Sequence, residues 1–326
     1  MKYVRIEGGQ KLSSFIEPMK AQLSDLPAFD NADWIFEIKW DGYRAIAEIN
    51  SSGNNRLYSR NGLTFDKAYP KVFEALKSFK KKAIIDGEIV VFDEQGKPNF
   101  QKLQNYKNND KYPIHFYAFD CLEANGKSIT DLSVVERKKI LKSILPKSDV
   151  IHYCDHVDGE GKALFLEMKK MGLEGMIAKR KDSKYYIGKR TSEWLKIKNI
   201  QTQEAIIVGF TAPKGSRSSF GSLLLAVKKK SKLVYIGNVG TGFTDKSLKE
   251  LYTKLKKIIR KSTPLDIPIK ETSDMTWVDP VLVCNIKYTE ITEEGSVRHP
   301  VFQGLRVDKE ADEVHLEKPV KRRSKK

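Results

Sequence analysis

Short apolar runs typical of strands alternate with stretches of helical spacing over the first 200 positions of the chain. Short apolar runs bounded by turn residues predict strands, and a period of about 3.6 predicts amphipathic helices. Strands are predicted at residues 34–38, 43–49, 83–86, 88–92 and 115–122. Helices are predicted at residues 68–80, 133–145 and 161–171. We expect the first two strands to meet at a turn formed by Asp41 and Gly42.

Two of these helices carry end signals in the sequence. Ser133 is followed by Glu136 at the spacing of a capping box, in which each residue satisfies a backbone N–H group at the start of the helix. Gly172 comes directly after the last helical position of residues 161–171. Because glycine adopts the left-handed conformation without strain, it predicts the end of that helix.

The pattern changes after Lys198. Strands are predicted at residues 204–210, 223–228, 233–238 and 281–289, and one helix at residues 245–260. Short strands with a single helix in ~115 residues are typical of a small Greek-key barrel such as an OB-fold. We therefore predict an α+β protein with the following parts: antiparallel sheets and flanking helices in residues 1–200, the barrel in residues 201–316, and a disordered basic tail in residues 317–326. The boundary is expected within residues 199–203.

The charge balance favours a polyanionic partner. Lysine and arginine number 59 against 42 acidic residues, a formal net charge of +17. Nucleic acid is the commonest partner of such a surface, although charge that only keeps a protein in solution gives the same count. No run of about 18 apolar residues is present, which excludes a membrane-spanning helix. The start of the chain lacks the apolar stretch of a signal peptide, which predicts a cytoplasmic protein.

Three cysteines, Cys121, Cys154 and Cys284, stand far apart in the sequence. Their odd number and the lack of C-x-x-C spacing argue against a disulfide framework or a four-cysteine zinc site. We expect them to pack as small apolar residues in a reducing compartment.

The segment Glu37-Ile38-Lys39-Trp40-Asp41-Gly42-Tyr43-Arg44 places one lysine in an apolar and aromatic setting. Burial and neighbouring positive charge would lower the pKa of Lys39, and the free amine could then attack phosphorus or a carbonyl carbon. Gly42 allows a tight turn beside a ligand, and Arg44 offers a fork for ribose or phosphate oxygens. Alone, the segment also fits a surface turn with a solvated lysine.

Four further groups follow in order along the chain. Arg60 stands at a strand end in Ser-Arg-Asn-Gly, where it could hold a phosphate. Glu88 and Glu174 each lie beside a glycine, and two converging carboxylates would suit Mg²⁺. Lys196 and Lys198 alternate on one strand face, which favours an anion between them. The fourth group is Arg306, Asp308 and Lys309. The plainer interpretations are ordinary turns, turn carboxylates and a solvated lysine face.

The ordered set KWDGYR, SRNG, DGE, FYAFD, EGMIAKR, WLKIK and RVDK resembles the covalent nucleotidyltransferase superfamily of DNA ligases, RNA ligases and mRNA capping enzymes. Residues 157–190, 213–225 and 298–309 resemble, more narrowly, the ligase domain of bacterial ligase D, an ATP-dependent end-joining enzyme. The likeness runs from about residue 15 to residue 314. It implies an ATP-dependent DNA ligase with an adenylylation domain at residues 1–200 and an OB-fold domain at residues 201–316.

The resemblance implies a role for each matching residue. Lys39 would be the nucleophile that takes AMP, and Lys196 and Lys198 would bind its α-phosphate. The nucleotide would also be contacted by Glu37 and Ile38 near adenine, Arg44 and Glu88 at the ribose, Phe119 stacked on the base, and Lys179. Arg60 would hold the 5′-phosphate of a nick. Glu174 and Glu88 would hold Mg²⁺, with Mn²⁺ as the alternative. Arg306, Asp308 and Lys309 would orient pyrophosphate, and Arg298 has a weaker claim.

The implied partners are ATP and nicked or broken double-stranded DNA, bound mainly through phosphates and therefore sensitive to salt. A Ku-type end-binding protein, a nucleoid location and a monomeric state also follow from the resemblance. Ligase D commonly carries polymerase and phosphoesterase domains, for which 326 residues leave no room, so we expect end processing elsewhere or a stand-alone nick sealer. The lack of clustered cysteines and of the extra domains of NAD-dependent ligases favours ATP.

Three alternatives stay open from the sequence. An RNA ligase or a GTP-using capping enzyme would keep the chemistry and change the acceptor. A catalytically inert nucleic-acid-binding module would keep the fold alone, and a phosphate-binding α+β protein would leave the charge unexplained. If the barrel serves both pyrophosphate and DNA, a hinge near residues 199–203 is expected.

Overall fold

The computed structural model describes residues 11–24, 27–50, 53–106, 111–213, 219–292 and 295–317. These residues form two compact units that meet between Ile200 and Gln201. We call residues 11–200 the N-terminal unit and residues 201–317 the C-terminal unit. The basic tail predicted at residues 317–326 lies, apart from Glu317, outside the described residues.

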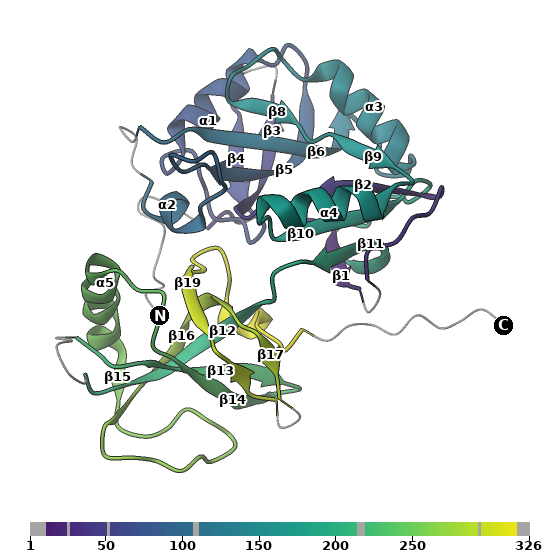
Figure 1. Ribbon diagram of the computed structural model, residues 1–326. Coiled ribbons are helices and arrows are strands. Elements are labelled where there is room, and N and C mark those ends of the chain that lie inside the picture. The colour runs from purple at the N-terminus through teal and green to yellow at the C-terminus, as the bar shows by residue number, and fades with distance from the viewer. Residues whose placement is uncertain are drawn as a thin grey trace. The chain divides into compact units, whose positions relative to one another are not determined.

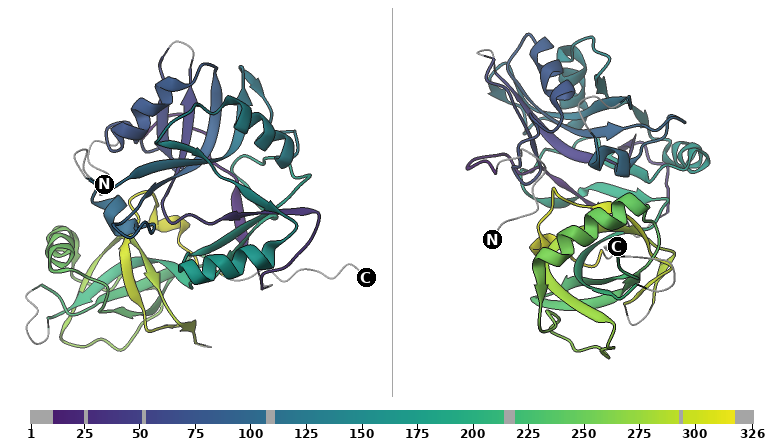
Figure 2. Two further views of the ribbon diagram at one scale, coloured as in Figure 1. Left: turned by 45° about the horizontal axis from the view of Figure 1, so that its top comes forward. Right: turned by 90° about the vertical axis from the view of Figure 1, so that its left-hand side faces the viewer.

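One sheet of the N-terminal unit carries the predicted nucleophile segment (Figure 1). Its strand order is β1 (Lys20–Leu23), β11 (Arg190–Lys198), β10 (Gly175–Arg180), β2 (Trp34–Ile38) and β9 (His156–Asp158). Only β1 and β11 run parallel; the other neighbours are antiparallel. Helix α4 (Gly161–Met171) packs Met168 against Phe36 and Met176 of this sheet. In Figure 2 the same helix, drawn in teal, lies along the strands.

The second sheet of this unit has the order β4 (Arg56–Ser59), β3 (Tyr43–Ile49), β5 (Ala83–Val91), β6 (Ile114–Ala124) and β7 (Lys127–Ser128). Strand β8 (Ile151–Tyr153) adds to β6 in parallel. The helices of this region are α1 (Pro70–Ala75), α2 (Phe100–Gln104) and α3 (Val134–Ile144). A cluster containing Phe119 from β6 and Trp194 from β11 joins the two sheets in one core.

The two strands predicted around the Asp41-Gly42 turn have the predicted bounds, but they do not pair with each other. Strand β2 belongs to the first sheet and β3 to the second. The chain crosses between sheets at Gly42, where a Cβ atom would overlap the carbonyl oxygen of Ile89. The two strands therefore do not pair across the predicted turn, and the segment after Lys39 is a crossover between the sheets.

The end signals of two helices are confirmed. The Ser133 side chain accepts from the backbone of Glu136, and the Glu136 carboxylate accepts from the backbone of Ser133. Gly172 ends α4 in the left-handed conformation with φ 69°. The helix predicted at residues 68–80 begins at Pro70 instead, because proline suits the first turn, and after Ala75 it tightens into a 3₁₀ turn, Leu76–Ser78.

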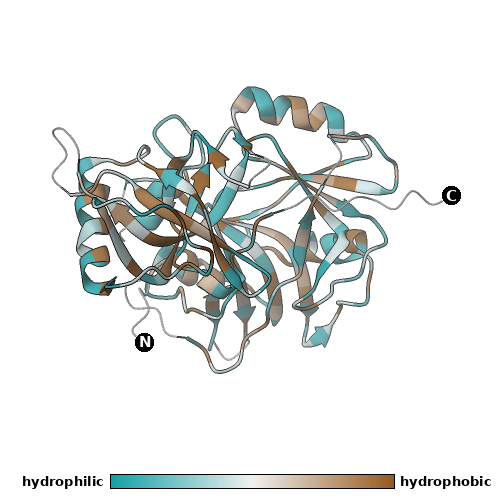
Figure 3. Cartoon of the chain, turned by 90° about the horizontal axis from the view of Figure 1, so that it is seen from below, coloured by the Kyte–Doolittle hydropathy of each residue, from teal (hydrophilic) through white to brown (hydrophobic). Residues whose placement is uncertain are grey.

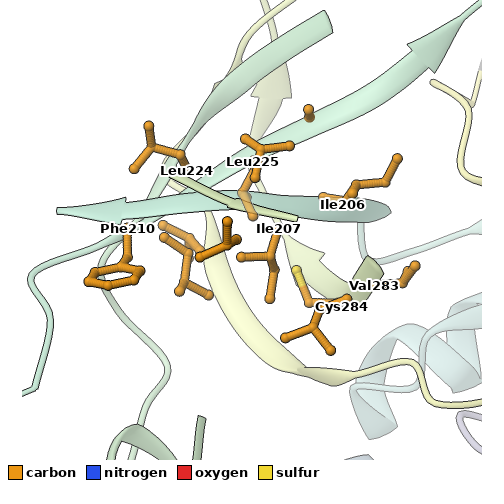
Figure 4. Close-up of a cluster of buried hydrophobic side chains, with 14 of the residues drawn as sticks. Ile206, Ile207, Phe210, Leu224, Leu225, Val283 and Cys284 are labelled. Atoms are coloured by element: carbon orange, nitrogen blue, oxygen red, sulfur yellow. The ribbon is translucent and has the colours of Figure 1, made fainter. Parts of the chain in front are cut away.

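The C-terminal unit is built from β12 (Thr202–Thr211), β13 (Leu223–Lys229), β14 (Lys232–Val239), β15 (Ile259–Arg260), β16 (Met275–Lys287), β17 (Glu290–Ile291), β18 (Val297–Arg298) and β19 (Val301–Leu305). The main sheet has the order β14-β13-β12-β16-β15, and β19 also pairs with β16. Figure 4 shows Ile207, Leu225 and Cys284 in the core between these strands. Helix α5 (Asp245–Leu255) closes the core with Leu248, Leu251 and Leu255.

Two predicted bounds in this unit differ from the structure. The helix predicted to reach residue 260 ends at Leu255, because Lys256–Ile258 form a 3₁₀ turn and Ile259–Arg260 then pair with β16. Strand β16 begins at Met275, before the predicted residue 281, since it also pairs with the far end of β12. The helices are two-coloured in Figure 3, as expected of elements that bury one face.

All three cysteines are buried free thiols, which confirms their predicted packing role. Of the helices that the structure describes, none is both long and apolar enough to cross a membrane.

Candidate active site

Lys39 leaves the end of β2 beside the start of β10. Its backbone N–H donates to the Gly175 carbonyl at 2.9 Å, and its ammonium forms an ion pair with the carboxylate of Glu174. The Lys39 side chain keeps 22% of its surface exposed, so it is only partly buried. The predicted nucleophile and the predicted metal ligand are therefore in direct contact.

Lys196 and Lys198 lie on the next strand, β11. The register pairs Gly175 with Lys198 and Ile177 with Lys196, which places both lysines beside the Glu174 end of β10. Burial raises the pKa of Glu174, but Lys39 first and then Lys198 and Lys196 outweigh burial, and the pKa lies below its ordinary value. The anion expected between the two lysines is thus Glu174 in the protein without ligand.

The pKa of Lys39 differs from the expectation. Burial lowers this pKa, but the Glu174 carboxylate raises it more, and Asp41 and Glu88 add to the rise, so the pKa lies above the ordinary value. The prediction of a lowered pKa considered burial and positive neighbours, and it left out the carboxylates that face Lys39. In the protein without ligand, Lys39 is a protonated amine held by a carboxylate, and it is not yet a nucleophile.

Glu88 and Glu174 both act on Lys39, so two carboxylates face the same amine. Glu88 lies on β5 opposite Arg44 of β3. Oxygen ligands of this kind fit Mg²⁺, which completes its shell with water and substrate phosphates. Within the described ranges, no three His, Cys, Asp or Glu side chains gather as a metal site. The residues present therefore fit a cation that a nucleotide helps to hold.

Arg44 is held by a carboxylate that sequence reasoning did not single out as a partner. Its guanidinium binds both oxygens of the fully buried Asp86 and donates to the Met19 carbonyl. The Tyr185 hydroxyl donates to the same Asp86 at 2.5 Å. The guanidinium carbon lies 4.5 Å from the ring centre of Phe119. Asp86 thus fixes Arg44 against the aromatic ring predicted to stack on the base.

Glu37 is the centre of a buried group of charges. Its carboxylate is 2% exposed and pairs with Lys138 at 2.6 Å and with Lys179 at 2.8 Å. Burial raises its pKa, but the two lysines together bring it below the ordinary value. Both carboxylate oxygens are therefore engaged by lysines. The adjacent Ile38 pairs with Met176 across β2 and β10.

Lys179 is the member of this group that lies nearest the aromatic side chains. Its ammonium lies 4.7 Å from the Phe119 ring centre and 4.3 Å from that of Trp194. Burial, with help from Lys138, lowers the pKa of Lys179 despite the pairing with Glu37. Phe119 itself is 9% exposed and belongs to the core that joins the sheets. Phe119 and Lys179 thus form one wall of the candidate nucleotide site.

Lys138 was missed by sequence reasoning. It lies on α3, is 1% exposed, and donates to Glu37 and to the Cys154 carbonyl. Its helical spacing from the apolar residues Val134 and Leu141 places it on the buried face of that helix. That spacing was the available signal, but a lysine on such a face is usually assigned to the solvent.

Arg60 follows β4 in a turn that is closed by the Gly62 N–H donating to the Ser59 carbonyl at 2.8 Å. Ser59 pairs with Ala45, so Arg60 leaves the sheet at the same end as Arg44. The strand-end position that the sequence predicted for Arg60 is confirmed.

The remaining predicted residues lie in the C-terminal unit. Arg306 binds Asp308 through two hydrogen bonds of 2.8 and 2.7 Å, and Lys309 forms an ion pair with Glu204. Asp308 is fully buried, and its carboxylate accepts both hydrogen bonds from Arg306, an arrangement suited to positioning that guanidinium. Arg298 lies at the surface and pairs with Glu290 at 2.8 Å.

The fold, a nucleotidyltransferase-type unit followed by a small β-barrel unit, is that of the ATP-dependent DNA ligase family. Residues 16–198 match the family described as ATP dependent DNA ligase domain, and residues 216–309 match the ATP dependent DNA ligase C terminal region. The chain therefore belongs to the ATP-dependent DNA ligase family. The α+β fold predicted from the sequence, with a nucleotidyltransferase domain and a C-terminal OB-fold domain, is confirmed.

More narrowly, the chain is similar to ligase D proteins. It is 36% identical over 321 residues to the multifunctional non-homologous end joining protein LigD of Pseudomonas aeruginosa, covering 96% of this chain and 38% of that protein. It is 35% identical over 311 residues to LigD of Mycobacterium tuberculosis, covering 94% of this chain and 40% of the relative. The chain thus spans about two fifths of the length of these curated relatives.

Two solved structures show the same fold over nearly their whole length. A mycobacterial DNA ligase D complexed with ATP and MES has a TM-score of 0.68 at 32% identity, covering 92% of this chain and 97% of that one. The ligase domain of M. tuberculosis LigD has a TM-score of 0.52 at 34% identity, with the same coverage of both chains.

Proposed function

We propose that this chain joins DNA strands by forming a covalent bond between Lys39 and AMP. The observation that carries the proposal is the contact between the Lys39 amine and Glu174, at a strand end flanked by Lys196 and Lys198. One nucleophile, one carboxylate and two fixed cations are the parts that nucleotidyl transfer from ATP requires. The match to the ligase family supports the same assignment.

The first step requires that Lys39 lose its proton. As long as Glu174 faces Lys39 alone, the amine stays charged. A divalent cation at Glu174 and Glu88 would neutralise those carboxylates, lower the pKa of the amine and stabilise charge on the phosphates. Lys39 then forms a bond from nitrogen to the α-phosphorus of ATP, the bond to the bridging oxygen breaks, and pyrophosphate leaves. Lys196 and Lys198 hold the charge that develops on the α-phosphate oxygens.

Two transfers to DNA complete the reaction. An oxygen of the 5′-phosphate at a nick attacks the AMP phosphorus, and the bond to Lys39 breaks to give DNA-adenylate and a free amine. The 3′-hydroxyl then attacks the 5′-phosphorus, releases AMP and forms the phosphodiester. Arg60, at the strand end shared with Arg44, is proposed to bind the 5′-phosphate. Sequence-independent phosphate contacts suit an enzyme that seals any sequence.

The C-terminal unit is proposed to serve the first step and then the DNA. Arg306, held by Asp308, and Lys309 would bind the leaving pyrophosphate, which needs cations on the side away from Lys39. Residues 1–200 and 201–316 would act as the adenylylation and OB-fold domains, with a hinge in residues 199–203. Such an enzyme is expected to change the arrangement of its units between the two tasks.

The biological setting follows the relatives, whose names place them in non-homologous end joining. We propose that this chain repairs nicked or broken duplex DNA in the cytoplasm, at the nucleoid, acts as a monomer, and works with a Ku-type end-binding protein. Mg²⁺ is the proposed metal, with Mn²⁺ as the alternative.

Incubation of the wild type and of Lys39→Ala with α-labelled ATP and Mg²⁺, followed by a denaturing gel, tests the proposal. Label should remain on the wild type and be absent from the variant, and nicked DNA should discharge it. Label on both proteins would mean that Lys39 is not the nucleophile. Discharge by nicked RNA alone, or labelling by GTP in place of ATP, would identify an RNA ligase or a capping-type enzyme.

A further inference from the structure

Two histidines meet on the second sheet of the N-terminal unit, outside the residues assigned above. His115 lies on β6 and His152 on the parallel strand β8. The His115 Nδ1 atom and the His152 Nε2 atom are 2.8 Å apart. Both nitrogens also face the carbonyl oxygen of Asp149, at 3.1 and 3.2 Å. Three atoms with lone pairs therefore form a small triangle.

No arrangement of protons gives a hydrogen bond along all three sides of this triangle. A hydrogen bond between the two nitrogens requires one of them to be unprotonated, and the lone pair of that nitrogen then faces the carbonyl oxygen. If both nitrogens carry protons directed at the oxygen, the two N–H groups face each other at 2.8 Å. Each protonation state leaves two of the three atoms in contact without a hydrogen bond between them, whereas a cation above the plane of the triangle, about 2.1 Å from each atom, would attract all three.

The dimensions of the triangle suit a divalent transition metal. Nitrogen and oxygen ligands lie about 2.1 Å from such ions, and two ligands at right angles are then about 3.0 Å apart. The observed sides of 2.8, 3.1 and 3.2 Å match one face of an octahedron. Asp149 is exposed and both histidines are only partly buried, so water can reach the remaining ligand positions.

We propose that His115, His152 and the Asp149 carbonyl bind one divalent transition-metal ion of the Ni²⁺, Co²⁺ and Zn²⁺ type. Imidazole nitrogen selects these ions over Mg²⁺, which prefers oxygen ligands. The site shares no residue with Glu88 and Glu174, so it would be separate from the metal proposed for catalysis. It does not depend on the proposed ligase function.

The site is connected to the nucleophile segment through stacked rings. The His152 and Tyr117 rings have centroids 5.4 Å apart, and Tyr117 stacks on Trp40 at 4.0 Å with an interplanar angle of 19°. Trp40 is the residue after Lys39. A bound paramagnetic ion such as Ni²⁺ should therefore quench the fluorescence of Trp40, which gives a readout that does not require activity.

The test is calorimetric titration of the tag-free full chain with NiCl₂, beside His115→Gln, His152→Gln and the control His315→Gln. His315 is an exposed histidine of the C-terminal unit, and its ring lies 3.1 Å from the Lys228 carbonyl. We expect one Ni²⁺ per chain for the wild type and the control. Each variant of the pair should lose at least about tenfold in affinity, because half of its imidazole ligands are gone. Quenching should disappear in Trp40→Phe.

Equal Ni²⁺ binding by the wild type and by both pair variants would overturn the site, as would the absence of binding to the wild type. Circular dichroism identifies any variant that fails to fold, and the other variant then decides the outcome. An excess of MgCl₂ should not displace Ni²⁺, and displacement at equal concentration would assign the ion to the carboxylates instead.

Discussion

At the scale of single residues, the pairing of Lys39 with Glu174 controls when the amine can react. Burial alone would favour the free amine, but the carboxylate reverses the shift and keeps Lys39 charged. On the proposed function, the same contact both places the nucleophile and keeps it protonated. Adenylylation would then require a ligand that weakens this contact, which would link the first step to the presence of ATP and a cation.

Replacing Glu174 with Gln should therefore expose the reactivity of Lys39. Without the carboxylate, burial dominates and the pKa of Lys39 falls, so more free amine is present at any given pH. Acetylation of Lys39 by acetic anhydride, followed by mass spectrometry from pH 7 to 10, should rise at lower pH in the variant than in the wild type. The control Glu88→Gln should shift the curve less, because Glu88 contributes less to the raised pKa. An unchanged curve for Glu174→Gln would contradict this account.

The buried group Lys138–Glu37–Lys179 carries two cations for one carboxylate. It connects α3, β2 and β10, three elements from distant parts of the sequence. The loss of folding stability on removing one charge from this group depends on which residue is changed. Loss of Lys138 leaves a balanced pair, whereas loss of the Glu37 charge leaves two buried ammonium groups that repel each other.

We predict that Glu37→Gln destabilises the N-terminal unit by about 3–5 kcal/mol and Lys138→Met by clearly less. Hydrogen exchange of peptides from α3 and β2, measured by mass spectrometry, reports the stability of the N-terminal unit separately from that of the C-terminal unit. Protection should fall strongly in Glu37→Gln and weakly in Lys138→Met. The reverse order would mean that Glu37 is neutral in the folded protein, contrary to its lowered pKa.

At the scale of elements, β10 organises the candidate site. Its Gly175 carbonyl accepts a hydrogen bond from the Lys39 N–H. The strand follows directly after Glu174 and pairs with β11, the strand of Lys196 and Lys198. Its first residue, Gly175, has φ 151°, and a Cβ atom there would overlap the carbonyl oxygen of Ile197. The glycine beside the acidic residue is therefore required by the close approach of β11.

Gly175→Ala should separate β10 from β11 and move Glu174 away from Lys39. We expect adenylylation from labelled ATP to fall by at least about tenfold, since small misplacements of reacting groups cost about 10²-fold. Gly172→Ala is a matched control, because it also has positive φ but meets nothing within 4 Å. That variant should lose about 1 kcal/mol of stability and keep its adenylylation rate. Equal rates in both variants would show that β10 does not position the site.

The sequence predicted an element well where its bounds depend on neighbouring residues alone. Short apolar runs gave β2 and β3 their bounds, and the capping box of Ser133 predicted the start of α3. Pairing between distant elements was not accessible, because β2 and β3 are adjacent in sequence yet belong to different sheets. The buried Lys138 was missed for the same reason, since its partner Glu37 is a hundred positions away.

At the scale of the whole molecule, the ordered motifs identified the family, whereas the charge state of the site came only from the structure. The order of the motifs extends over most of the sequence, so it identifies the family even where the bounds or pairing of a single element are predicted wrongly. The pKa of Lys39 depends on three carboxylates that come from three segments. The same holds for Asp308, whose full burial and pairing with Arg306 were not accessible from the sequence.

The division of work between the two units can be tested on the separate reaction steps. Arg306→Ala should slow the formation of labelled Lys39 by about 10²-fold, the usual effect of removing one charge-stabilising donor. Sealing of a nick that already carries AMP should be nearly unchanged, because that step releases no pyrophosphate. Asp308→Asn should give a weaker form of the same result, as it loosens Arg306 without removing it. Arg298→Ala, at the surface beside Glu290, serves as the control and should leave both steps intact. Equal loss in both steps would instead assign Arg306 to the binding of DNA.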